Sequence, residues 1–393
     1  MSLLMAFSIV VIILAVGDII STKTKAFIPS VFVAALLFLI GFWTFFPKDI
    51  VALAGFQSPV VNLSMYLLIT HMGTLLSVNE LAAQWRSVAV SLIGIAGIMA
   101  MTMTLGAAVF GFDAAVIATP PLTGGIVAAI IMNEAAANLG MQQLAVLAII
   151  TYVMQGFVGY PLTSWMLKKE GKRLLKGFRN GEIKYNESDS ESAAVESKKL
   201  IPDLPKKYKT TYVLLAKLGL TAWAAVAAGE FLEPFLGISP FVYCLIFGVI
   251  ANAIGFVEKR PLNLSNSFGF LITVLMAFIF AGLADATPAM LAELAVPLAG
   301  IIFFGVTGMA ILSMLLGKFL GYTKEMSFAT ALTALYGFPP NYILTEEGAK
   351  ALAKNEEEKK FLMSEMLPKM LVGGFTTVTI ASVIIAGIFV NFL

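Results

Sequence analysis

The stretch that decides the fold reads Thr119-Pro120-Pro121-Leu122-Thr123-Gly124-Gly125, and it interrupts an otherwise apolar part of the chain. The two prolines lack amide donors and the two glycines accept almost any backbone angle, so a regular helix is expected to break here. Non-helical backbone at membrane depth is tolerated inside protein or beside water, where transporters use it to bind ions and substrates. A proline-kinked helix or an external loop is the alternative interpretation.

A similar stretch lies in the C-terminal half and reads Thr333-Ala334-Leu335-Tyr336-Gly337-Phe338-Pro339-Pro340-Asn341. Paired landmarks precede the two stretches in the same order: Asn62-Leu63-Ser64 with Asn263-Leu264-Ser265, and Ile28-Pro29-Ser30 with Ile238-Ser239-Pro240. Self-similarity at a long offset is typical of a duplicated unit. The sequence therefore predicts two related halves, 1–167 and 210–393, joined by a polar linker, 168–209.

Composition places the chain in a membrane. Hydrophobic residues make up 59% of it and charged residues 13%, and apolar runs recur along its length. A net charge of +2 gives no reason to expect a nucleic-acid partner. The single cysteine, Cys244, excludes an intrachain disulfide and a cysteine-based metal site. We expect an all-α polytopic protein surrounded by membrane lipid.

Ten apolar segments are long enough to cross a bilayer of about 30 Å at about 1.5 Å per residue. In the first half they are 3–21, 28–46, 60–79, 87–110 and 143–167. In the second half they are 210–232, 238–257, 265–284, 295–320 and 361–392. In each half the Pro-Gly stretch lies before the last helix, and the second stretch with its flanks covers about 325–350.

The distribution of basic residues predicts the topology, because cytoplasmic loops are enriched in Lys and Arg. With the linker inside, and each Pro-Gly segment dipping into the membrane and returning, only Lys48 of the 26 basic residues lies outside. If both segments crossed fully, seven basic residues would lie outside. Five crossings per half give the halves opposite orientations. The expected fold is thus two inverted five-helix repeats, each with a re-entrant hairpin, in the cytoplasmic membrane, with a cytoplasmic linker and both termini outside.

Two stretches resemble the bacterial sodium:glutamate symporter family. They are the run from Ile238 to Asn252, and Thr123-Gly124-Gly125, where that family has Ser-Gly-Gly. Related carriers, such as the 2-hydroxycarboxylate family, share the plan of paired halves. The resemblance implies Na⁺-driven uptake of an amino acid or carboxylate by a homodimer. The sequence departs from the family at Ile126-Val127-Ala128-Ala129, which replaces a Gly- and His-rich continuation and puts glutamate itself in doubt.

Candidate binding residues gather around the two breaks. Backbone groups there, with polar side chains nearby, offer oxygens to Na⁺ and donors to a carboxylate. Thr123 and Asn341 are the candidate Na⁺ ligands. The predicted substrate and ion site comprises Thr123, Gly124, Gly125, Asn133, Glu134, Tyr336, Gly337 and Asn341. For Glu134 two interpretations stay open: a buried cation ligand or proton carrier, and a carboxylate at the outer mouth.

Three further residues are weaker candidates. His71 lies midway along its predicted helix, where an ionisable side chain is a functional candidate by default, although a packing histidine fits equally well. Asn62 and Asn263 lie near the starts of paired helices, where capping is the simpler role.

These features predict a secondary active transporter, a symporter of a small organic anion or amino acid with glutamate-like chemistry, working by alternating access. Na⁺ is expected as the coupling ion, with no other cofactor. A proton-coupled carrier or an exporter of the same fold is the alternative. A channel fits less well, because two oppositely inserted hairpins in one chain suit alternating access better than one filter on a symmetry axis. An intramembrane aspartyl enzyme is disfavoured, because it would need two carboxylates that share a proton at membrane depth, and the sequence does not offer such a pair.

Overall fold

The computed structural model describes residues 1–75, 84–183, 200–202, 204–236 and 240–393, and helices make up most of them. No β-strand occurs among these residues. Six helices are long and apolar enough to cross a membrane, and three shorter apolar helices accompany them. The chain is therefore an all-helical, multi-pass membrane protein. Parts of three predicted segments lie outside the described residues: 76–79, 184–199 with 203 in the linker, and 238–239.

The chain divides into two compact units, which are described separately. Unit 1 comprises 1–10, 51–83 and 181–279, and unit 2 comprises 11–50, 84–180 and 280–393. Helices α1 (Leu3–Lys23), α3 (Ile50–Leu53) and α15 (Phe268–Ala281) contain residues of both.

Unit 1 is built around the crossing of α4 (Ser58–Gly73) and α13 (Pro240–Ala253). A Cβ added at Gly248 would lie 2.1 Å from the carbonyl oxygen of Thr70, and one at Gly73 would lie 2.3 Å from that of Leu245. The absence of a side chain at both glycines lets the two backbones approach closely, as in many membrane helix pairs. The elements of unit 1, besides those it shares, are α4 (Ser58–Gly73), η2 (Lys206–Tyr208), α12 (Thr211–Leu236), α13 (Pro240–Ala253) and α14 (Pro261–Leu264).

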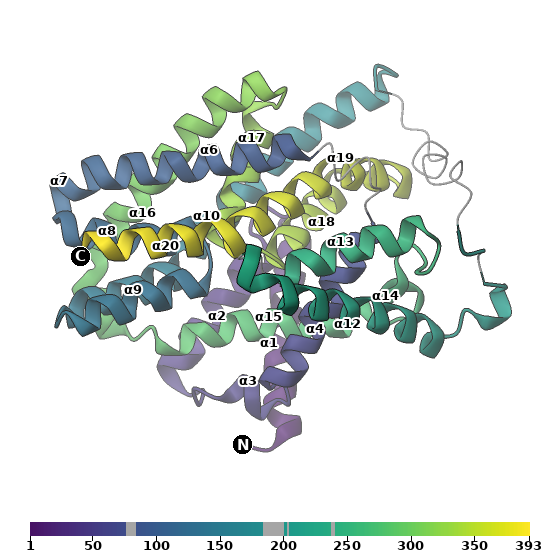
Figure 1. The fold of residues 1–393 in the computed structure, drawn as a ribbon, viewed down its shortest axis with the longest axis horizontal. Helices are drawn as coiled ribbons and strands as arrows, with labels where there is room; N and C mark the ends of the chain where they lie inside the picture. Colours follow the sequence, from purple (N-terminus) through teal and green to yellow (C-terminus); the bar gives the residue numbers. More distant parts are fainter. Residues whose placement is uncertain (76–83, 184–199, 203, 237–239) are drawn as a thin grey trace. The chain divides into compact units, whose positions relative to one another are not determined.

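Unit 2 contains the last elements of both predicted halves together with α2 (Figure 1). From the first half it takes α2 (Ser30–Thr44), α6 (Trp85–Met101), the π-helix η1 (Thr102–Gly106), α7 (Ala107–Phe110), α8 (Phe112–Thr123), α9 (Ile126–Asn138) and α10 (Gln142–Arg179). From the second half it takes η3 (Gly282–Asp285), α16 (Pro288–Gly317), η4 (Lys318–Leu320), α17 (Lys324–Leu332), η5 (Thr333–Leu335), α18 (Pro340–Leu352), α19 (Glu356–Phe375), the π-helix η6 (Thr376–Ala381), α20 (Ser382–Phe389) and η7 (Val390–Phe392).

Helix starts in unit 2 follow from local sequence. The side-chain oxygens of Thr287, Thr323 and Asn355 each accept the backbone N–H three residues on, which caps α16, α17 and α19. The predicted end of α10 at 167 is too early. The helix continues to Arg179, with Lys176 and Arg179 in its last turn, where cations interact favourably with the helix dipole.

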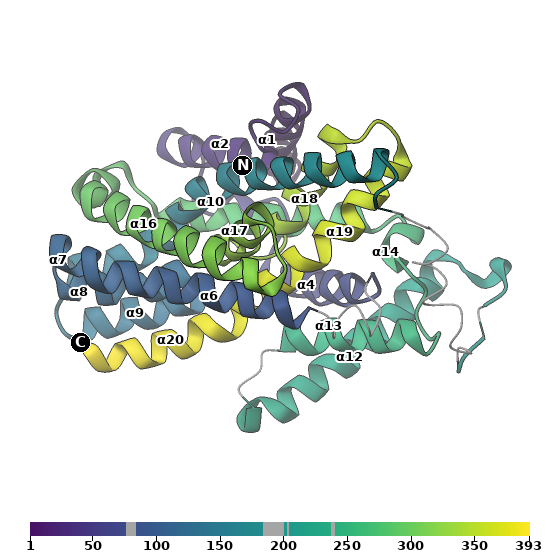
Figure 2. The same ribbon diagram turned by 90° about the horizontal axis from the view of Figure 1, so that it is seen from above.

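Helices α6 and α16 (Figure 1, Figure 2) pack against each other in opposite chain directions, because Gly94 lies against Met309 while Phe110, after α6, lies against Gly300. Gly97 and Gly308 meet at their crossing, because a Cβ at Gly308 would lie 2.0 Å from the carbonyl oxygen of Gly97. Near the end of α7, the ring of Phe110 fills the space beside Gly300. Glycine thus sets the helix separation here as well.

The two ends of unit 2 differ in chemistry. At the basic end, where α10 ends and α19 begins, the Arg179 guanidinium donates to both carboxylate oxygens of Glu358 at 2.7 Å. Nearby, Glu170 accepts hydrogen bonds from Arg173 and from the hydroxyl of Thr323. At the opposite end, Met141 and Leu393 pack against an apolar cluster shared by α8, α9, α10 and α20.

Candidate functional site

Two broken segments enter unit 2 from its two ends. The first consists of α8 and α9, and residues of both helices belong to the apolar cluster at the opposite end, against which Met141, just after α9, also packs. The second, α17, η5 and α18, starts beside Thr323 and ends at Leu352, both at the basic end. Figure 1 shows α8 and α9 lying side by side near the C-terminus. We call Thr123–Gly125 tip 1 and 333–339 tip 2.

The glycines of tip 1 adopt backbone angles that side chains disfavour, with φ of 127° at Gly124 and 82° at Gly125. They also lie against other elements. A Cβ added at Gly124 would lie 3.0 Å from the carbonyl oxygen of Ala334, and one at Gly125 would lie 2.6 Å from that of Val378. Tip 1 therefore packs on both tip 2 and the π-helix η6.

Tip 2 meets the same π-helix. Gly337 has a φ of 64°, and a Cβ there would lie 2.9 Å from the Cγ2 atom of Val378. Both tips thus converge on η6, a region that we call the tip junction. A π-helix inside a longer helix leaves backbone hydrogen bonds irregular and frequently marks a functional site.

Three polar side chains predicted for the site lie in the tips or, for Asn341, just after tip 2, but each has internal partners. The hydroxyl of Thr123 donates to the carbonyl oxygen of Pro120 at 2.7 Å. The Nδ2 group of Asn341 donates to Met370 at 3.0 Å, and its Oδ1 accepts the N–H of Tyr342. The Tyr336 hydroxyl lies 2.7 Å from the hydroxyl of Thr163 on α10. These bonds hold the tips in place, while each oxygen keeps a further lone pair.

Asn133 and Glu134 lie away from the tips, on α9. The Nδ2 group of Asn133 donates to the carbonyl oxygen of Ala145 at 2.8 Å and so fastens α9 to α10. Glu134 is exposed, so the interpretation as a buried ligand finds no support in its surroundings.

The weaker candidates belong to unit 1. His71 is buried, and its Nδ1 atom accepts the N–H of Leu262 at 3.3 Å. The side chain of Asn263 forms a further hydrogen bond with His71, so two of the three candidates lie together. Asn62 is exposed. The contacts of His71 match those of a packing histidine that fastens α4 to α14.

Two polar residues of α10 are absent from the predicted site. Thr151 and Gln155 are completely buried, and neither the Thr151 hydroxyl nor either amide atom of Gln155 has a hydrogen-bond partner among the described residues. The signal was present in the sequence, because Gln155 is an amide within an apolar run predicted to cross the membrane. A second unremarked pair, Thr102 of η1 and Thr119 of α8, is hydrogen-bonded at 2.7 Å.

The tip junction is polar and uncharged. Neither tip contains an acidic or basic residue, and Thr151, Gln155 and Asn341 are neutral as well. In the described part of the chain, no group of three or more His, Cys, Asp or Glu side chains could hold a metal ion. A hard monovalent cation, bound by neutral oxygens, fits such a set better than a transition metal.

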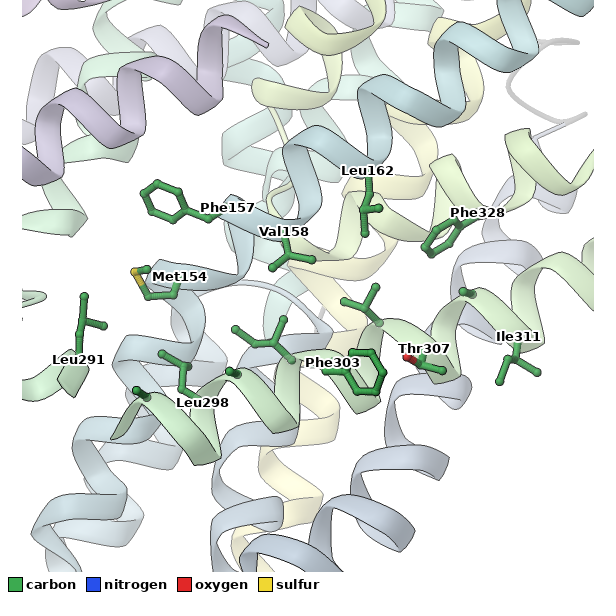
Figure 3. Close-up of a pocket in the computed structure, with 15 residues that line it drawn as sticks. Met154, Phe157, Val158, Leu162, Leu291, Leu298, Phe303, Thr307, Ile311 and Phe328 are labelled. Carbon is green, nitrogen blue, oxygen red and sulfur yellow. The ribbon is translucent and has the colours of Figure 1, made fainter. Parts of the chain in front are cut away.

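A separate groove of about 700 Å³ lies between α10 and α16 (Figure 3). Met154, Phe157 and Leu162 line one side, and Leu298 and Phe303 line the other. Thr307 supplies the single polar side chain of the lining. Such a surface cannot satisfy the hydrogen bonds of a polar solute, so the groove is not the candidate site.

No protein-family model matches the chain, and no curated protein matches it. Among solved structures, the chain is similar to the sodium proton antiporter MjNhaP1 from Methanocaldococcus jannaschii. The identity is 15% and the TM-score 0.41, over 100% of this chain and 99% of that one. That protein is a transporter and not an enzyme, as was expected of this chain. The assignment to the sodium:glutamate symporters is wrong, because the match is an antiporter of a different transporter family. A similarity at this level does not assign the chain to a protein family.

Proposed function

We propose that the protein is a secondary active transporter that works by alternating access, with its binding site at the tip junction. The observation that carries this proposal is the convergence of two broken helical segments, which enter from opposite ends of unit 2, on the π-helix η6. Broken helices that meet in the interior expose backbone groups to a bound solute or ion, as discontinuous helices of transporters do.

In this proposal the two segments are re-entrant hairpins. Their limbs are too short to span the membrane: the 13 residues of α9 and of α18 extend about 20 Å each, against about 30 Å of hydrocarbon. With these hairpins, the ten apolar segments predicted from the sequence would form two inverted repeats of five. The basic end of unit 2 then faces the cytoplasm, together with the linker, and both termini lie outside the cytoplasmic membrane.

The cargo that suits the tip junction is a small organic anion carried together with Na⁺. A carboxylate without a counter-charge is expensive to desolvate, and the tips supply no cationic side chain. A Na⁺ ion bound beside it would supply the missing charge, which gives a physical reason for coupling. Proton coupling would need a group that titrates near neutral pH, and neither tip contains a carboxylate, histidine or lysine side chain. A homodimer stays a prediction.

Transport measurements test the proposal. Small carboxylates would first be screened for thermal stabilisation of the purified protein with and without Na⁺, because a ligand that binds the folded state raises its stability. Since coupling is reciprocal, Na⁺ and the solute should each tighten binding of the other by the same factor, typically about 5–150-fold.

Solutes that stabilise the protein would then be offered to proteoliposomes. We expect saturable accumulation under a Na⁺ gradient at constant pH, and none when choline replaces Na⁺. Accumulation under a pH gradient without Na⁺ would instead establish proton coupling. Flux that does not saturate and follows the solute's own gradient would indicate a channel and contradict the proposal.

A further inference from the structure

Gln155 is the least satisfied polar side chain in the described part of unit 2. It is completely buried, and both its Nε2 and Oε1 atoms lack partners. Thr151, one helical turn earlier on the same face of α10, has an equally buried and unpartnered hydroxyl. Native proteins seldom leave buried amides unpaired, so such a group calls for a water molecule, an ion or a ligand.

The position of Gln155 relates it to tip 2. One turn further along α10, a Cβ added at Gly159 would lie 2.9 Å from the ring of Tyr336 and 3.1 Å from the side chain of Leu335. One more turn along, Thr163 bonds the Tyr336 hydroxyl. The face of α10 that carries Gln155 therefore faces tip 2. Helix α10 ends at the basic end, and Gln155 precedes Gly159 in it. Gln155 therefore lies nearer than Gly159 to the opposite end, from which the first broken segment enters.

The helix ends at the tips offer partial charges of both signs, because α8 and η5 end there and α9 and α18 begin there, and the C-terminal ends are the ones that suit a cation. Helix α8 ends at Thr123 and η5 ends at Leu335, and these two C-terminal ends are in contact, since a Cβ at Gly124 would lie 3.0 Å from the Ala334 carbonyl oxygen. Carbonyl groups at helix C-termini carry partial negative charge. The amide oxygen of Gln155 and the hydroxyl oxygen of Thr151 are further neutral hard oxygens, on the face of α10 that carries Gly159 and Thr163 against tip 2.

We propose that Gln155 and Thr151 supply side-chain ligands to a Na⁺ ion at the tip junction. This inference rests on the proposed function and names the site of its coupling ion. The Gln155 Oε1 atom faces the ion, and the Nε2 group of the same amide donates to the anionic solute. One side chain then contacts both cargoes, so that binding of either orders the ligand of the other.

The test is the Na⁺ dependence of thermal unfolding in the full-length protein, measured against choline at constant ionic strength. At a Na⁺ concentration of about 100 times Kd, we expect the Tm of the wild type to rise by roughly 3 °C. Gln155→Met should lose this rise, and Thr151→Val should lose most of it. Gln142→Met replaces an exposed glutamine at the start of the same helix and should keep it.

The sign of the effect without Na⁺ separates a ligand from a structural residue. Gln155→Met removes an unpartnered amide, so its Tm in choline should equal or exceed that of the wild type, whereas loss of a hydrogen-bonded side chain would lower it. A full Na⁺ shift in both Gln155→Met and Thr151→Val would overturn this site, as would the absence of a shift in the wild type. If Na⁺-driven uptake persists in those cases, the proposed function stands and only the site fails.

Discussion

The backbone at Gly125 combines a positive φ of 82° with close approach to the Val378 carbonyl oxygen. Gly125→Ala should therefore lower the stability twice, by about 1–2 kcal/mol for the disfavoured φ and by about 1–3 kcal/mol for the crowding. It should also abolish transport, because tip 1 could no longer pack on η6. The Tm of the purified variant and its uptake in proteoliposomes measure the two effects.

Gly140 provides the matched control. Its φ is 79°, but nothing lies within 4 Å of an added Cβ. Gly140→Ala should lower the stability only by the amount due to the disfavoured φ and should leave transport intact. Equal Tm values for the two variants would mean that tip 1 does not pack as closely as the structure indicates.

Tyr336 and Thr163 test whether a tip residue is held by the fold or by a ligand. Either Tyr336→Phe or Thr163→Val leaves one buried hydroxyl without its partner, at a cost of about 1–3 kcal/mol. The double variant should lose less than the sum of the two, with a coupling of about 0.5–3 kcal/mol. The unfolding free energies of the wild type, the two single variants and the double variant give this double-mutant cycle. Unchanged stability with lost transport in Tyr336→Phe would assign its hydroxyl to the ligand instead.

At the residue scale, the sequence predicted glycines better than polar side chains. Gly124, Gly125 and Gly337 stand out because two prolines accompany each break, and all three adopt positive φ at the tip junction. Asn133 could not be placed in the same way, since its role depends on Ala145, a backbone partner in the next helix. Gln155 was not predicted because it is far from both breaks in the sequence, and α10 approaches tip 2 only in three dimensions.

At the scale of elements, close helix crossings at glycine set the geometry of unit 2. Gly308→Ala should destabilise the protein by more than about 2 kcal/mol, because the added Cβ would lie 2.0 Å from the Gly97 carbonyl oxygen and force α6 and α16 apart. Gly387→Ala, in the helix α20 with nothing within 4 Å, should be neutral or stabilising by up to about 1 kcal/mol. Thermal unfolding compares them, and similar losses in both variants would refute the close crossing.

Apolar length predicted the six long and three shorter apolar helices found among the described residues, while their ends depended on signals of different strength. Where a cap is local, as at Asn355, the start is readable from sequence, yet the prediction began this helix at 361 because it followed hydropathy alone. Helix α10 passes 167 because its polar end is held by partners far along the chain, such as Glu358 for Arg179. Hydropathy contains no information on such partners.

At the scale of the whole molecule, the duplicated pattern and the compact units answer different questions. The pattern follows the chain and separates 1–167 from 210–393. Contacts instead group α6 to α10 with α16 to α20, so unit 2 contains the last helices and the broken segment of each half. Elements that lie far apart in the chain can pack on each other once both have been synthesised. The order of elements along the sequence does not reveal which of them form such a unit.

Membrane topology gives the last prediction, and two single cysteines decide it in a Cys244→Ser background. If both broken segments are re-entrant, Phe112→Cys at the start of α8 should react with an impermeant thiol reagent in intact cells, and Lys354→Cys should be shielded. Both side chains are exposed in the structure, so access depends on the membrane. If the segments crossed fully, the two results would be exchanged. Leu139→Cys should react and Ser192→Cys in the linker should be shielded in either case, which controls for expression and for leaky cells.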